Sequence, residues 1–503
     1  MQLSEQEQVR RENLEKIRAA GLDPYPADGF EVSHMAEQVV SNYEEGADGF
    51  TDLSLAGRLM MKRVMGKASF AELQDNSGRI QLYLNRDEIC PTEDKTLYND
   101  VFKKFLDIGD FIGVKGSVFK TKTGETSLRV AELTVLSKSL RPLPIVKIDA
   151  EGNVHDAFTD PDLRYRQRYV DLVVNPEVRD VFRKRSMMYK SMRDFLDERG
   201  YLEVETPILQ PLYGGAAARP FKTHHNTLDM PLYLRIANEL YLKRLIVGGF
   251  DGVYEFSKDF RNEGMSRFHN PEFTQIELYV AYKDYEWMMD LVEEMVEKVA
   301  LDLHGSTQVQ VGENVIDFKR PWKRYTMYGA IEHFTGVDIS GMDEVEMRKA
   351  AKEMHVPLED SMARGKIIDE IFGEKCEAQL IQPTYITDYP IEMSPLAKKH
   401  RSVDGLVERF EAICNGKEIC NAFSELNDPI DQRERFEAQL ELGKRGDDEA
   451  MVLDEDFLRS LEYGMPPTAG LGIGMDRLAM IMTNSPSIQE VIFFPQMRPE
   501  KSD

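Results

Sequence analysis

Alternation of apolar and polar residues from residue 53 to residue 138 predicts a small all-β unit. Runs such as GRIQLYLN and FIGVKGSVFK follow the period of two that is typical of half-buried strands. Turn-forming sequences such as DNSG and KTG separate these runs. We predict five strands and one helical stretch at 98–106, arranged as a small barrel over residues 51–140.

The residues on either side of the predicted barrel have a different pattern. A charged stretch at 1–20 is predicted to be a helix that ends at Gly21, and residues 1–50 are therefore interpreted as an N-terminal helical segment. Residues 141–150 begin with the sequence RPLP, which is typical of a stiff linker. A second and larger unit is expected after this linker.

The larger unit, residues 151–503, mixes helices with longer strands. Apolar positions recur at helical spacing over 176–199, Gly200 ends this helix, and a strand follows that ends at Pro207. Residues 321–375 are helix-rich, show no strand pattern, and are interpreted as an insertion between two parts of a sheet. The predicted fold class of the whole chain is α+β.

Composition excludes several classes of protein. The 503 residues include 63 basic and 88 acidic side chains, a formal net charge of −25, and 42% are hydrophobic. This content supports buried cores, and the negative charge argues against non-specific coating of nucleic acid. No apolar run is long enough to span a bilayer, and the four cysteines form no CxxC pair. We expect a soluble, intracellular protein with neither a zinc site nor a disulfide framework.

The stretch 253–279 predicts an antiparallel hairpin with one polar face. At a period of two, Arg261 on the first strand shares a face with Phe273, Glu277 and Tyr279 on the second. This face could line a cleft. It could equally be the solvated side of an ordinary amphipathic hairpin.

A second hairpin is predicted around the Asn415-Gly416 pair, which favours a type I′ turn. Strict alternation pairs Glu411 with Cys420 and places Glu411 and Glu418 on one face as diagonal neighbours. Two such carboxylates repel each other unless a cation lies between them, and Mg²⁺ suits oxygen ligands and a phosphate-bearing substrate. The alternative is a pair of solvated glutamates on an exposed edge.

The same alternation sends Asn421 and Glu425 to the opposite face of this second hairpin. They could serve the same site only if the strand twists or bulges between Cys420 and Ala422.

Glycines at 470, 472 and 474 recur at a period of two, so one face of this predicted strand carries no side chains and a flat ring could lie on the backbone. A helix is predicted to begin near Met475. Arg477 in its first turn is unfavourably placed for the helix dipole unless an anion is near. The alternative is close packing of the helix on the strand with Arg477 in solvent.

Small residues in YGGAAARPF, from 213 to 221, would let a ligand approach the backbone near Gly215. Further along, Glu239 opens an amphipathic helix. Its carboxylate could meet a ligand amine or could simply cap the helix.

The order of these motifs resembles that of the class II aminoacyl-tRNA synthetases. The long helix with Pro207 looks like motif 1, FRNEGMSRFHNPEFTQIELY looks like motif 2, and GLGIGMDRLAM looks like motif 3. GGAAARPF, ANELYLKRL and NAFSELNDP are similar to the bacterial-type lysyl enzymes, except that Asn238 stands where proline is common and Ala422 where glycine is usual. The resemblance implies an OB-fold barrel for the anticodon, an antiparallel sheet flanked by helices, and a homodimer.

The resemblance also implies a site for ATP. Arg261 would hold the α-phosphate and the substrate carboxylate, and Phe273 would stack on adenine with Arg477 on its other face, so the two arginines are the expected catalytic residues. Glu411 and Glu418 would hold Mg²⁺. The ATP-binding set implied in this way is Arg261, Glu263, Arg267, His269, Phe273, Glu411, Gly474 and Arg477.

Lysine is the amino acid that the resemblance implies. Glu239 and the backbone of Gly215 would take its α-amino group, while Glu425 and Tyr279 would take its ε-ammonium. The full implied set is Gly215, Glu239, Glu277, Tyr279, Asn421 and Glu425. The expected reaction activates L-lysine with ATP to lysyl-adenylate and transfers it to the 3′ end of tRNA(Lys) in the cytoplasm.

The barrel carries a local excess of positive charge at Arg58, Lys62, Arg63 and Lys67, with no acidic residue between 54 and 70. By resemblance, Phe70 would stack on an anticodon base, and base edges would be contacted by Arg58, Gln81 and Glu132. The alternative for Phe70 is a place in the barrel core.

Two other functions remain open. An aspartyl or asparaginyl synthetase would share the barrel and the three motifs, but its substrate has no side-chain ammonium, so Glu239, Glu277 and Glu425 favour lysine. A catalytically silent RNA-binding relative would be expected to lack the phosphate-binding arginines, and both Arg261 and Arg477 are present.

Overall fold

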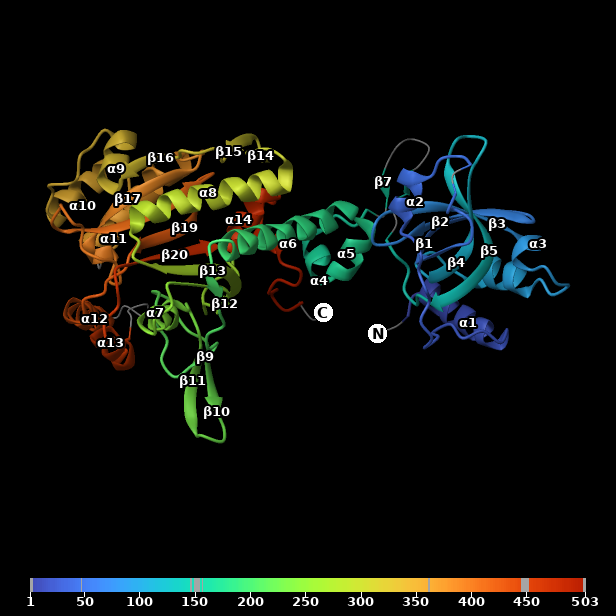
Figure 1. The fold of residues 1–503 in the computed structure, drawn as a ribbon, viewed down its shortest axis with the longest axis horizontal. Helices are drawn as coiled ribbons and strands as arrows, with labels where there is room; N and C mark the ends of the chain where they lie inside the picture. Colours follow the sequence, from blue (N-terminus) through green and yellow to red (C-terminus); the bar gives the residue numbers. More distant parts are fainter. Residues whose placement is uncertain are drawn as a thin grey trace. The chain divides into compact units, whose positions relative to one another are not determined.

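A computed structural model shows two compact units, Met1–Phe158 and Thr159–Asp503 (Figure 1). We treat each unit by itself. The residues that the structure describes are 3–46, 48–144, 147–148, 154–155, 157–360, 362–444 and 452–500. Much of the linker predicted at 141–150 therefore lies outside the described residues, which within this stretch are 141–144 and 147–148.

The first unit contains the predicted five-stranded barrel, closed in the order β1-β2-β3-β5-β4. Alternate residues fill its interior, and Leu59, Leu73, Leu82 and Leu128 are fully buried there. All pairings are antiparallel except β3 with β5. The barrel strands are β1 Leu53–Met65, β2 Ala68–Gln74, β3 Arg79–Asn85, β4 Phe111–Lys120 and β5 Thr126–Ser137.

Helices close the barrel and precede it. The helical stretch predicted at 98–106 is present as a wide π-helix, η1, whose Tyr98, Val101 and Phe102 are fully buried against the barrel core. The remaining elements of this unit are α1 Glu5–Ala19, α2 Ala36–Asn42, α3 Arg86–Ile89, η1 Leu97–Phe105, β6 Lys147–Ile148 and β7 Val154–His155.

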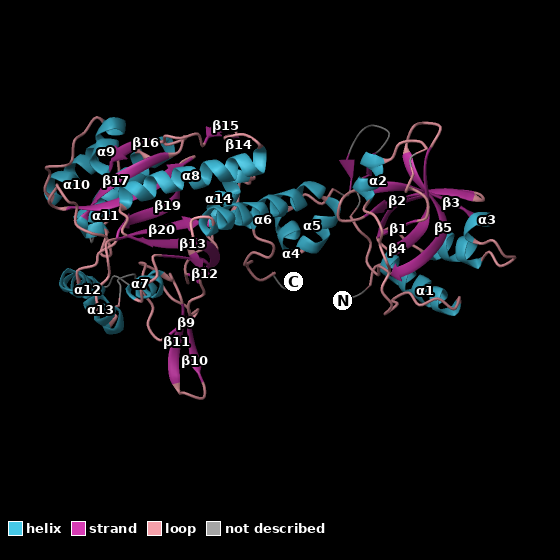
Figure 2. Cartoon of the chain, viewed as in Figure 1, coloured by secondary structure: helices cyan, strands magenta, loops and turns pink. Residues whose placement is uncertain are grey.

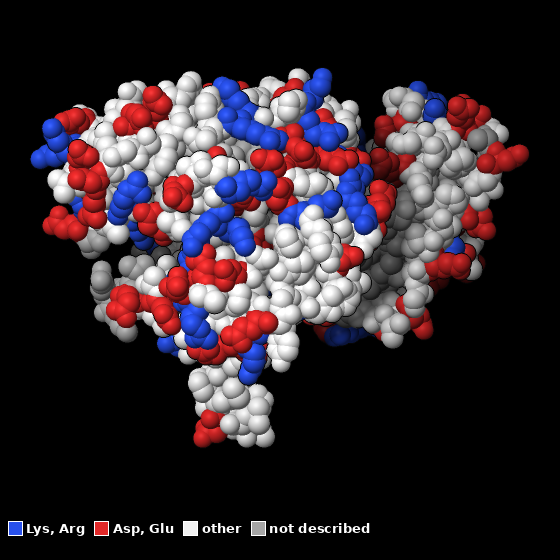
Figure 3. Space-filling model, turned by 60° about the vertical axis from the view of Figure 1, so that its left-hand side comes forward, with Lys and Arg blue, Asp and Glu red and all other residues white. Residues whose placement is uncertain are grey.

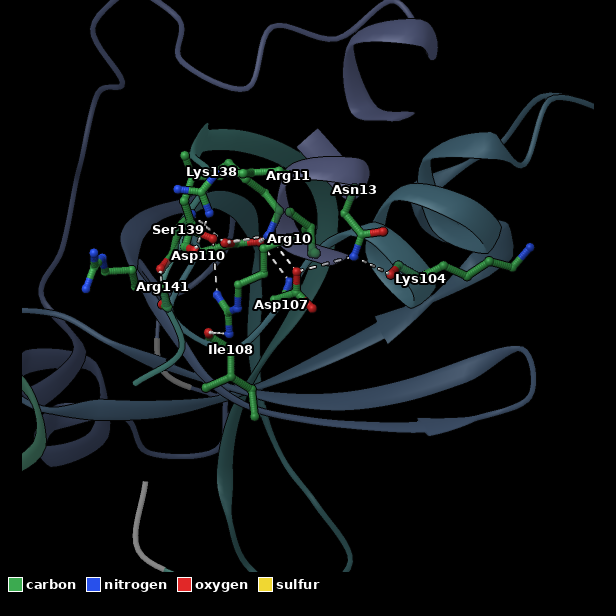
Figure 4. Close-up of polar contacts among 12 residues, drawn as sticks. Arg10, Arg11, Asn13, Lys104, Asp107, Ile108, Asp110, Lys138, Ser139 and Arg141 are labelled. Carbon is green, nitrogen blue, oxygen red and sulfur yellow. Dashed lines mark hydrogen bonds and ion pairs between the residues drawn. The ribbon is translucent and has the colours of Figure 1, made fainter. Parts of the chain in front are cut away.

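The helix α1 is fixed to the barrel by buried charges (Figure 4). Ser4 caps its first turn, and the Arg10 guanidinium donates to the carbonyl oxygens of Ile108 at 2.8 Å and Ser139 at 3.1 Å. Beside it the buried Lys138 ammonium pairs with Asp110 at 3.0 Å. This arrangement explains why a strongly charged helix is part of a folded unit.

The second unit is built on an eight-stranded sheet in the order β16-β17-β18-β19-β20-β13-β12-β8 (Figure 2). The six central strands are antiparallel, and the two edge strands, β16 and β8, run parallel to their neighbours. The strands are β8 Leu202–Glu203, β12 Gly252–Phe260, β13 Glu272–Ala281, β16 Lys323–Thr326, β17 Thr384–Pro390, β18 Leu406–Cys414, β19 Lys417–Ser424 and β20 Thr468–Gly474.

One face of this sheet is covered by long helices. In Figure 1, α8 Tyr285–His304 lies along the sheet, with α6 Pro176–Asp197 and α14 Met475–Met482 beside it. Their apolar residues pack on alternate sheet positions such as Ile276, Leu278, Leu471 and Ile473. The residues between these positions, 277 and 472 among them, therefore point to the opposite face, where the candidate site lies.

The opposite face is bordered by α7 Glu239–Val247, by α13 Glu455–Glu462 and by the helices α9–α11. The described part of the chain contains no helix that is both long and apolar enough to cross a membrane. The other elements are α4 Pro161–Arg166, α5 Arg168–Val174, β9 Leu209–Gln210, β10 Lys222–His225, β11 Met230–Leu234, β14 Gln308–Val311, β15 Asn314–Asp317, α9 Met327–Thr335, α10 Glu344–Glu353, α11 Arg364–Lys375, η2 Glu377–Gln379, η3 Ile391–Met393, α12 Pro429–Lys444 and α15 Ile488–Val491.

Two local predictions were wrong. The strand expected to run to Pro207 is only the two-residue β8, because just Leu202 and Glu203 pair with β12. The stretch 321–375 is helix-rich but begins with β16, which pairs in parallel with β17, so α9–α11 form the crossover between two neighbouring strands. Parallel strands need such a long connection.

Candidate active site

The first predicted hairpin is formed by β12 and β13 with the predicted faces. Glu255 lies opposite Glu277, and Asp259 lies opposite Phe273. Arg261 follows β12, and its guanidinium carbon is 5.1 Å from the centre of the Phe273 ring. Its buried Nε has no hydrogen-bond partner among the described residues. An orphaned guanidinium donor beside an aromatic face is suited to an anionic, flat ligand.

The loop between β12 and β13 carries polar groups to the edge of this face. Glu263 accepts a hydrogen bond from the backbone of Arg219 at 3.3 Å, and Arg267 is exposed. The His269 ring is 2.8 Å from Ser266 Oγ and 3.2 Å from Arg477 Nη2. Desolvation, followed by the Arg477 guanidinium and assisted by Arg261, lowers the pKa of His269.

Arg477 lies in the first turn of α14, as predicted, and it is not free in solvent. Its Nη1 donates to the backbone and side-chain oxygens of Glu418, both at 3.1 Å. Of the two guanidiniums predicted to hold ATP, that of Arg477 contacts His269, and that of Arg261 acts on the same imidazole electrostatically. Phe273 contacts Arg261, whereas Arg477 contacts Glu418, so the two groups expected to enclose adenine do not touch each other in the described contacts.

The glycine face of β20 forms the floor between β13 and β19. Gly472 lies opposite both Glu277 and Asn421. A Cβ atom at Gly472 or Gly474 would meet nothing closer than 3.8 Å, so both positions leave space above the backbone. At Gly470 a Cβ atom would overlap Glu425 Oε1 and lie 2.6 Å from Tyr279 Cε1, so this glycine makes room for two site residues.

The second hairpin has the predicted turn but not the predicted register. Asn415 and Gly416 have φ of 51° and 68°, and Ile413 pairs with Glu418 as expected. Beyond that pair, Ala412 faces Cys420, so Glu411 lies opposite Asn421 and not Cys420. One extra residue, Ile419, accounts for the shift.

This bulge determines which residues share the site. It occurs before Cys420, not between Cys420 and Ala422, and it places Asn421 on the face of Glu411 and Glu418. Residues 423 and 425 follow on that face. Ala422 instead packs in the core under α8, so the substitution at this position does not line the candidate site.

Arg409, which sequence reasoning missed, lies between these groups. It donates to Glu411 Oε1 at 2.6 Å and to Asn421 Oδ1 at 3.1 Å. Burial raises the pKa of Glu411 to about 7, with Arg409 opposing and Glu418 adding to the shift. The described residues contain no cluster of three or more metal-ligating side chains. Glu411 and Glu418 supply carboxylate oxygens from β18 and β19, which is the donor type that Mg²⁺ prefers when phosphates and water complete its coordination.

A buried acidic pocket lies beyond the glycine floor. Its carboxylates Glu239, Glu277 and Glu425 are 6%, 5% and 2% exposed. Burial raises the pKa of Glu277 well above its ordinary value, with Asp259 the next contributor. The Tyr279 hydroxyl donates to Glu277 Oε2 at 3.0 Å. The predicted lysine site is therefore composed mainly of buried charged side chains.

The structure shows why glycine stands at position 215 and what the Asn238 side chain does. Gly215 has φ of 86°, and a Cβ atom there would meet Ala237 and Glu239 at 3.2 Å. Its backbone consequently lies against the residue that opens α7. The Asn238 side chain donates to Glu255 at 2.8 Å, which makes it part of the buried support for the sheet.

The outward face of the barrel carries a row of aromatic and basic residues in register across four strands: Arg63, Phe70, Tyr83 and Arg129. The Phe70 and Tyr83 rings are 5.4 Å apart, and Phe70 is half-buried outside the barrel core. The alternative of a core Phe70 is thereby excluded. Tyr83 and Arg129 were missed, although their spacing from Phe70 follows from strand pairing.

Other predicted barrel residues are placed differently. A bulge at Met60 turns Lys62 inward, where its ammonium donates to the carbonyl oxygens of Phe102 and Lys103. Arg58 lies 4.1 Å from the Phe111 ring and donates to Gly109, away from Phe70.

Of the two remaining barrel residues, Gln81 lies opposite Ser127, two residues from Arg129 along β5. Glu132 lies further along β5 and pairs with Lys115 at 3.2 Å. The structure thus brings Gln81 to Phe70 and Tyr83 but leaves Glu132 apart.

Acidic and basic side chains are interspersed over the face of the larger unit seen in Figure 3. The charged residues that distinguish the candidate active site are the buried ones described above.

Comparison with known proteins identifies the family. Residues 160–498 match the family of class II tRNA synthetases (D, K and N), and residues 53–136 match the OB-fold nucleic acid binding domain. The chain is similar to the lysine-tRNA ligase of Christiangramia forsetii, with 64% identity over 500 residues that cover 99% of this chain and 87% of that protein.

Two further relatives carry the same name. The lysine-tRNA ligase of Porphyromonas gingivalis is 62% identical over 502 residues, covering 100% of this chain and 87% of that protein. That of Azobacteroides pseudotrichonymphae is 59% identical over 501 residues and is covered over 100% of both chains. The resemblance drawn from the three motifs and the barrel is confirmed: the chain belongs to the class II tRNA synthetases, in the family of the lysine-tRNA ligases.

Proposed function

We propose that this chain activates L-lysine with ATP and transfers it to tRNA(Lys) on the polar face of its eight-stranded sheet. The lysine carboxylate attacks the α-phosphorus of ATP in line, and pyrophosphate leaves. The terminal ribose hydroxyl of the tRNA then attacks the acyl carbon of the adenylate, and AMP leaves. The observation that carries this proposal is the cluster of buried carboxylates Glu239, Glu277 and Glu425, which lies on the sheet face that also carries Phe273 and its neighbour Arg261.

Arg261 and Arg477 are the proposed catalytic residues. Phosphoryl transfer needs little covalent help from a protein, and its rate depends on positioning and on neutralising charge that builds on phosphate oxygens. The orphaned Nε of Arg261 supports its role as a donor to the α-phosphate and the lysine carboxylate. His269 and Arg267 are placed to reach the outer phosphates, and Gly474 and Phe273 to border the adenine.

Glu411 and Glu418 would hold Mg²⁺ together with the phosphates of ATP, and the ion would supply further positive charge there. Each carboxylate is paired with an arginine in this structure, Glu411 with Arg409 and Glu418 with Arg477. These arginines hold the two carboxylates in place on the sheet. Glu263 is proposed to assist at the ATP site through its contact with the 219 backbone.

Selection of lysine follows from the acidic pocket. A buried carboxylate left without its ammonium partner is costly, so a neutral amino acid of similar length should be rejected by about 10⁴-fold or more. Glu239 and the Gly215 backbone are proposed to take the α-amino group. Glu425, Tyr279 and Glu277 are proposed to take the ε-ammonium, with Asn421 at the border of the pocket.

Attachment of radiolabelled lysine to tRNA(Lys) by the purified chain, with ATP and Mg²⁺ present, tests the proposed function. We expect lysyl-tRNA to accumulate with lysine alone among the natural amino acids. Charging with aspartate or asparagine, or no charging at all, would contradict the proposal.

The Michaelis constant for lysine is expected to fall as pH rises above the range in which an ordinary glutamate titrates, by up to about ten-fold per pH unit. The reason is that burial, followed by Asp259 and Glu239, raises the pKa of Glu277 in the free protein. Glu255 and the Tyr279 hydroxyl also face this carboxyl. Lysine binds the ionised carboxylate, so binding releases a proton and is favoured when protons are scarce.

Initial rates of lysine-dependent pyrophosphate exchange at each pH provide this measurement. Glu277→Gln removes the titrating group and should flatten the profile. A Michaelis constant for the unchanged protein that is constant or rises over this range would show that Glu277 does not titrate at the lysine site.

The barrel is proposed to bind the anticodon through Phe70, Tyr83 and the basic residues in register with them. One stacked base contributes about 1–3 kcal/mol, so Phe70→Ala should lower kcat/KM for tRNA charging by about ten-fold or more. Lysine-dependent pyrophosphate exchange should be unaffected. Because Phe70 lies outside the barrel core, the thermal midpoint should also stay the same, whereas the core change Leu73→Ala should lower it. Equal loss of charging and of thermal stability would contradict anticodon stacking.

The segment after α6 is proposed to form a homodimer interface. It exposes the apolar side chains of Leu202, Ile208, Leu209 and Leu212, each between 43% and 50% accessible. Apolar side chains gathered in this way mark surfaces that other proteins cover. Pro207 lies within the same segment, and the cytoplasm is the proposed compartment of the reaction.

A further inference from the structure

A buried lysine of the protein itself lies in the acidic pocket. Lys243 is on the second turn of α7, and its side chain is 0% exposed. Its ammonium donates to Glu239 Oε1 at 2.5 Å and forms an ion pair with Glu425. These are the two carboxylates proposed to receive the α-ammonium and the ε-ammonium of the substrate.

Apart from the two carboxylates that it contacts, the surroundings of Lys243 are apolar. Lys243 lies among apolar neighbours, with the Phe423 and Phe457 rings 5.5 and 6.0 Å from its ammonium, and Leu242 and Ile246 of the same helix are buried. A methionine of similar length would fill this space without the cost of desolvating an ammonium. A buried group of ion pairs often adds no stability over packed apolar residues in its place, so the presence of Lys243 together with Glu239 and Glu425 points to a functional role.

The charges in the pocket indicate that role. Lys243 is the cation in contact with both Glu239 and Glu425. Arg409 also favours the ionised form of Glu239, whereas Asp259 and Glu255 act against ionisation of the neighbouring Glu277. Without Lys243 the two carboxylates would lose their shared cation, and buried carboxylates that repel one another take up protons. A protonated carboxyl cannot pair with an incoming ammonium.

The geometry agrees with a fixed spacing between the two carboxylates. Glu239 comes from the start of α7, whereas Glu425 follows β19, and Lys243 bridges them. Gly470 opens the space in which Glu425 and Tyr279 lie. A single ammonium bonded to both carboxylates therefore ties the helix to the sheet across the substrate pocket.

We propose that Lys243 is a positioning and specificity-determining residue: it bridges Glu239 and Glu425, favours their ionised forms and fixes their separation, so that they select an amino acid with two ammonium groups at the distance found in lysine. This inference rests on the proposed function of the pocket. It deepens that function by assigning a role to a residue that does not contact the reacting atoms.

Lys243→Met tests the inference through lysine-dependent pyrophosphate exchange over a range of pH. We expect the Michaelis constant for lysine to rise by about ten-fold or more while kcat changes less, since the charge lost is one that supports substrate binding. The dependence of that constant on pH should move to higher pH, because burial raises the pKa of both carboxyls and the Lys243 ammonium opposes this rise. Discrimination between lysine and the shorter ornithine should also weaken. A purely structural role for Lys243 would not move the pH profile or this ratio.

Matched controls separate the possible failures. Lys349→Met, at an exposed position of α10, should leave all of these quantities unchanged. If Lys243→Met does not fold, Lys243→Gln retains a hydrogen-bond donor without the charge, and the same shifts are expected of it. An unchanged or lower Michaelis constant in an active variant would overturn the inference and leave the proposed function intact. Absence of lysine-dependent exchange in the unsubstituted protein would instead overturn the proposed function and, with it, this inference.

Discussion

Replacement of Arg261 by alanine is expected to lower kcat for lysine-dependent pyrophosphate exchange by about 10²–10³-fold. The guanidinium lies beside the Phe273 ring, and its buried Nε has no partner among the described residues, so it is available to a ligand. Removing a donor that meets charge in the transition state reduces the rate more than it reduces substrate binding. The dissociation constant for lysine, measured by calorimetry, should change far less than kcat.

The control for this variant is Arg18→Ala. It removes an exposed guanidinium on α1 that forms an ion pair with Glu15, one turn earlier in the same helix. Its exchange rate should equal that of the unsubstituted chain. An unchanged turnover number in Arg261→Ala would show that Arg261 takes no part in the chemical step. A loss confined to the Michaelis constant would reassign it to simple binding.

Glu425→Gln is expected to raise the Michaelis constant for lysine by about 10²-fold or more, with a smaller effect on kcat. Glu425 is 2% exposed, and its carboxylate already holds the Lys243 ammonium. The amide would leave two buried ammonium groups, one from the protein and one from the substrate, with one carboxylate fewer between them. The penalty is large because neither ammonium can be solvated in the pocket.

Exchange kinetics with varied lysine provide the measurement, and Glu353→Gln on the exposed surface of α10 is the matched control. The control should have unchanged kinetics. If Glu425→Gln used lysine as well as the unsubstituted chain, the ε-ammonium would have to lie elsewhere.

The sequence predicts much of the candidate site because period-two patterns determine faces. Arg261, Phe273 and Glu277 share a face of the β12–β13 hairpin as expected, and the glycines of β20 lie beside them. The same motifs predicted the α+β class, the OB-fold barrel and the synthetase family, and all three are confirmed. A single sequence can indicate which residues share a face because its strands alternate regularly and because Asn415-Gly416 strongly favours a turn.

Bulges limit what such patterns can predict. Ile419 shifts β19 by one residue and so brings Asn421 to Glu411, which strict alternation excluded. The two consecutive buried residues Ile419 and Cys420 were the available signal. In the barrel, the bulge at Met60 turned Lys62 to the inside, so a count of charges along β1 overstated its basic surface.

Buried charged residues were also not predicted from the sequence. Lys243 stands four residues after Glu239, a spacing that is usually read as an exposed helical ion pair. Only the packing of α7 against the sheet shows that it is buried next to Glu425. Arg409 likewise gives no sign in the sequence that it joins Glu411 to Asn421.

The central claim is that the buried carboxylates of this sheet select lysine for reaction with ATP. Exchange of radiolabelled pyrophosphate into ATP, measured with the full chain and each natural amino acid in turn, tests it most directly. We expect exchange with lysine and a rate at least about 10⁴-fold lower with neutral amino acids of similar length. Comparable exchange with aspartate, asparagine or methionine, or none with lysine, would contradict the account.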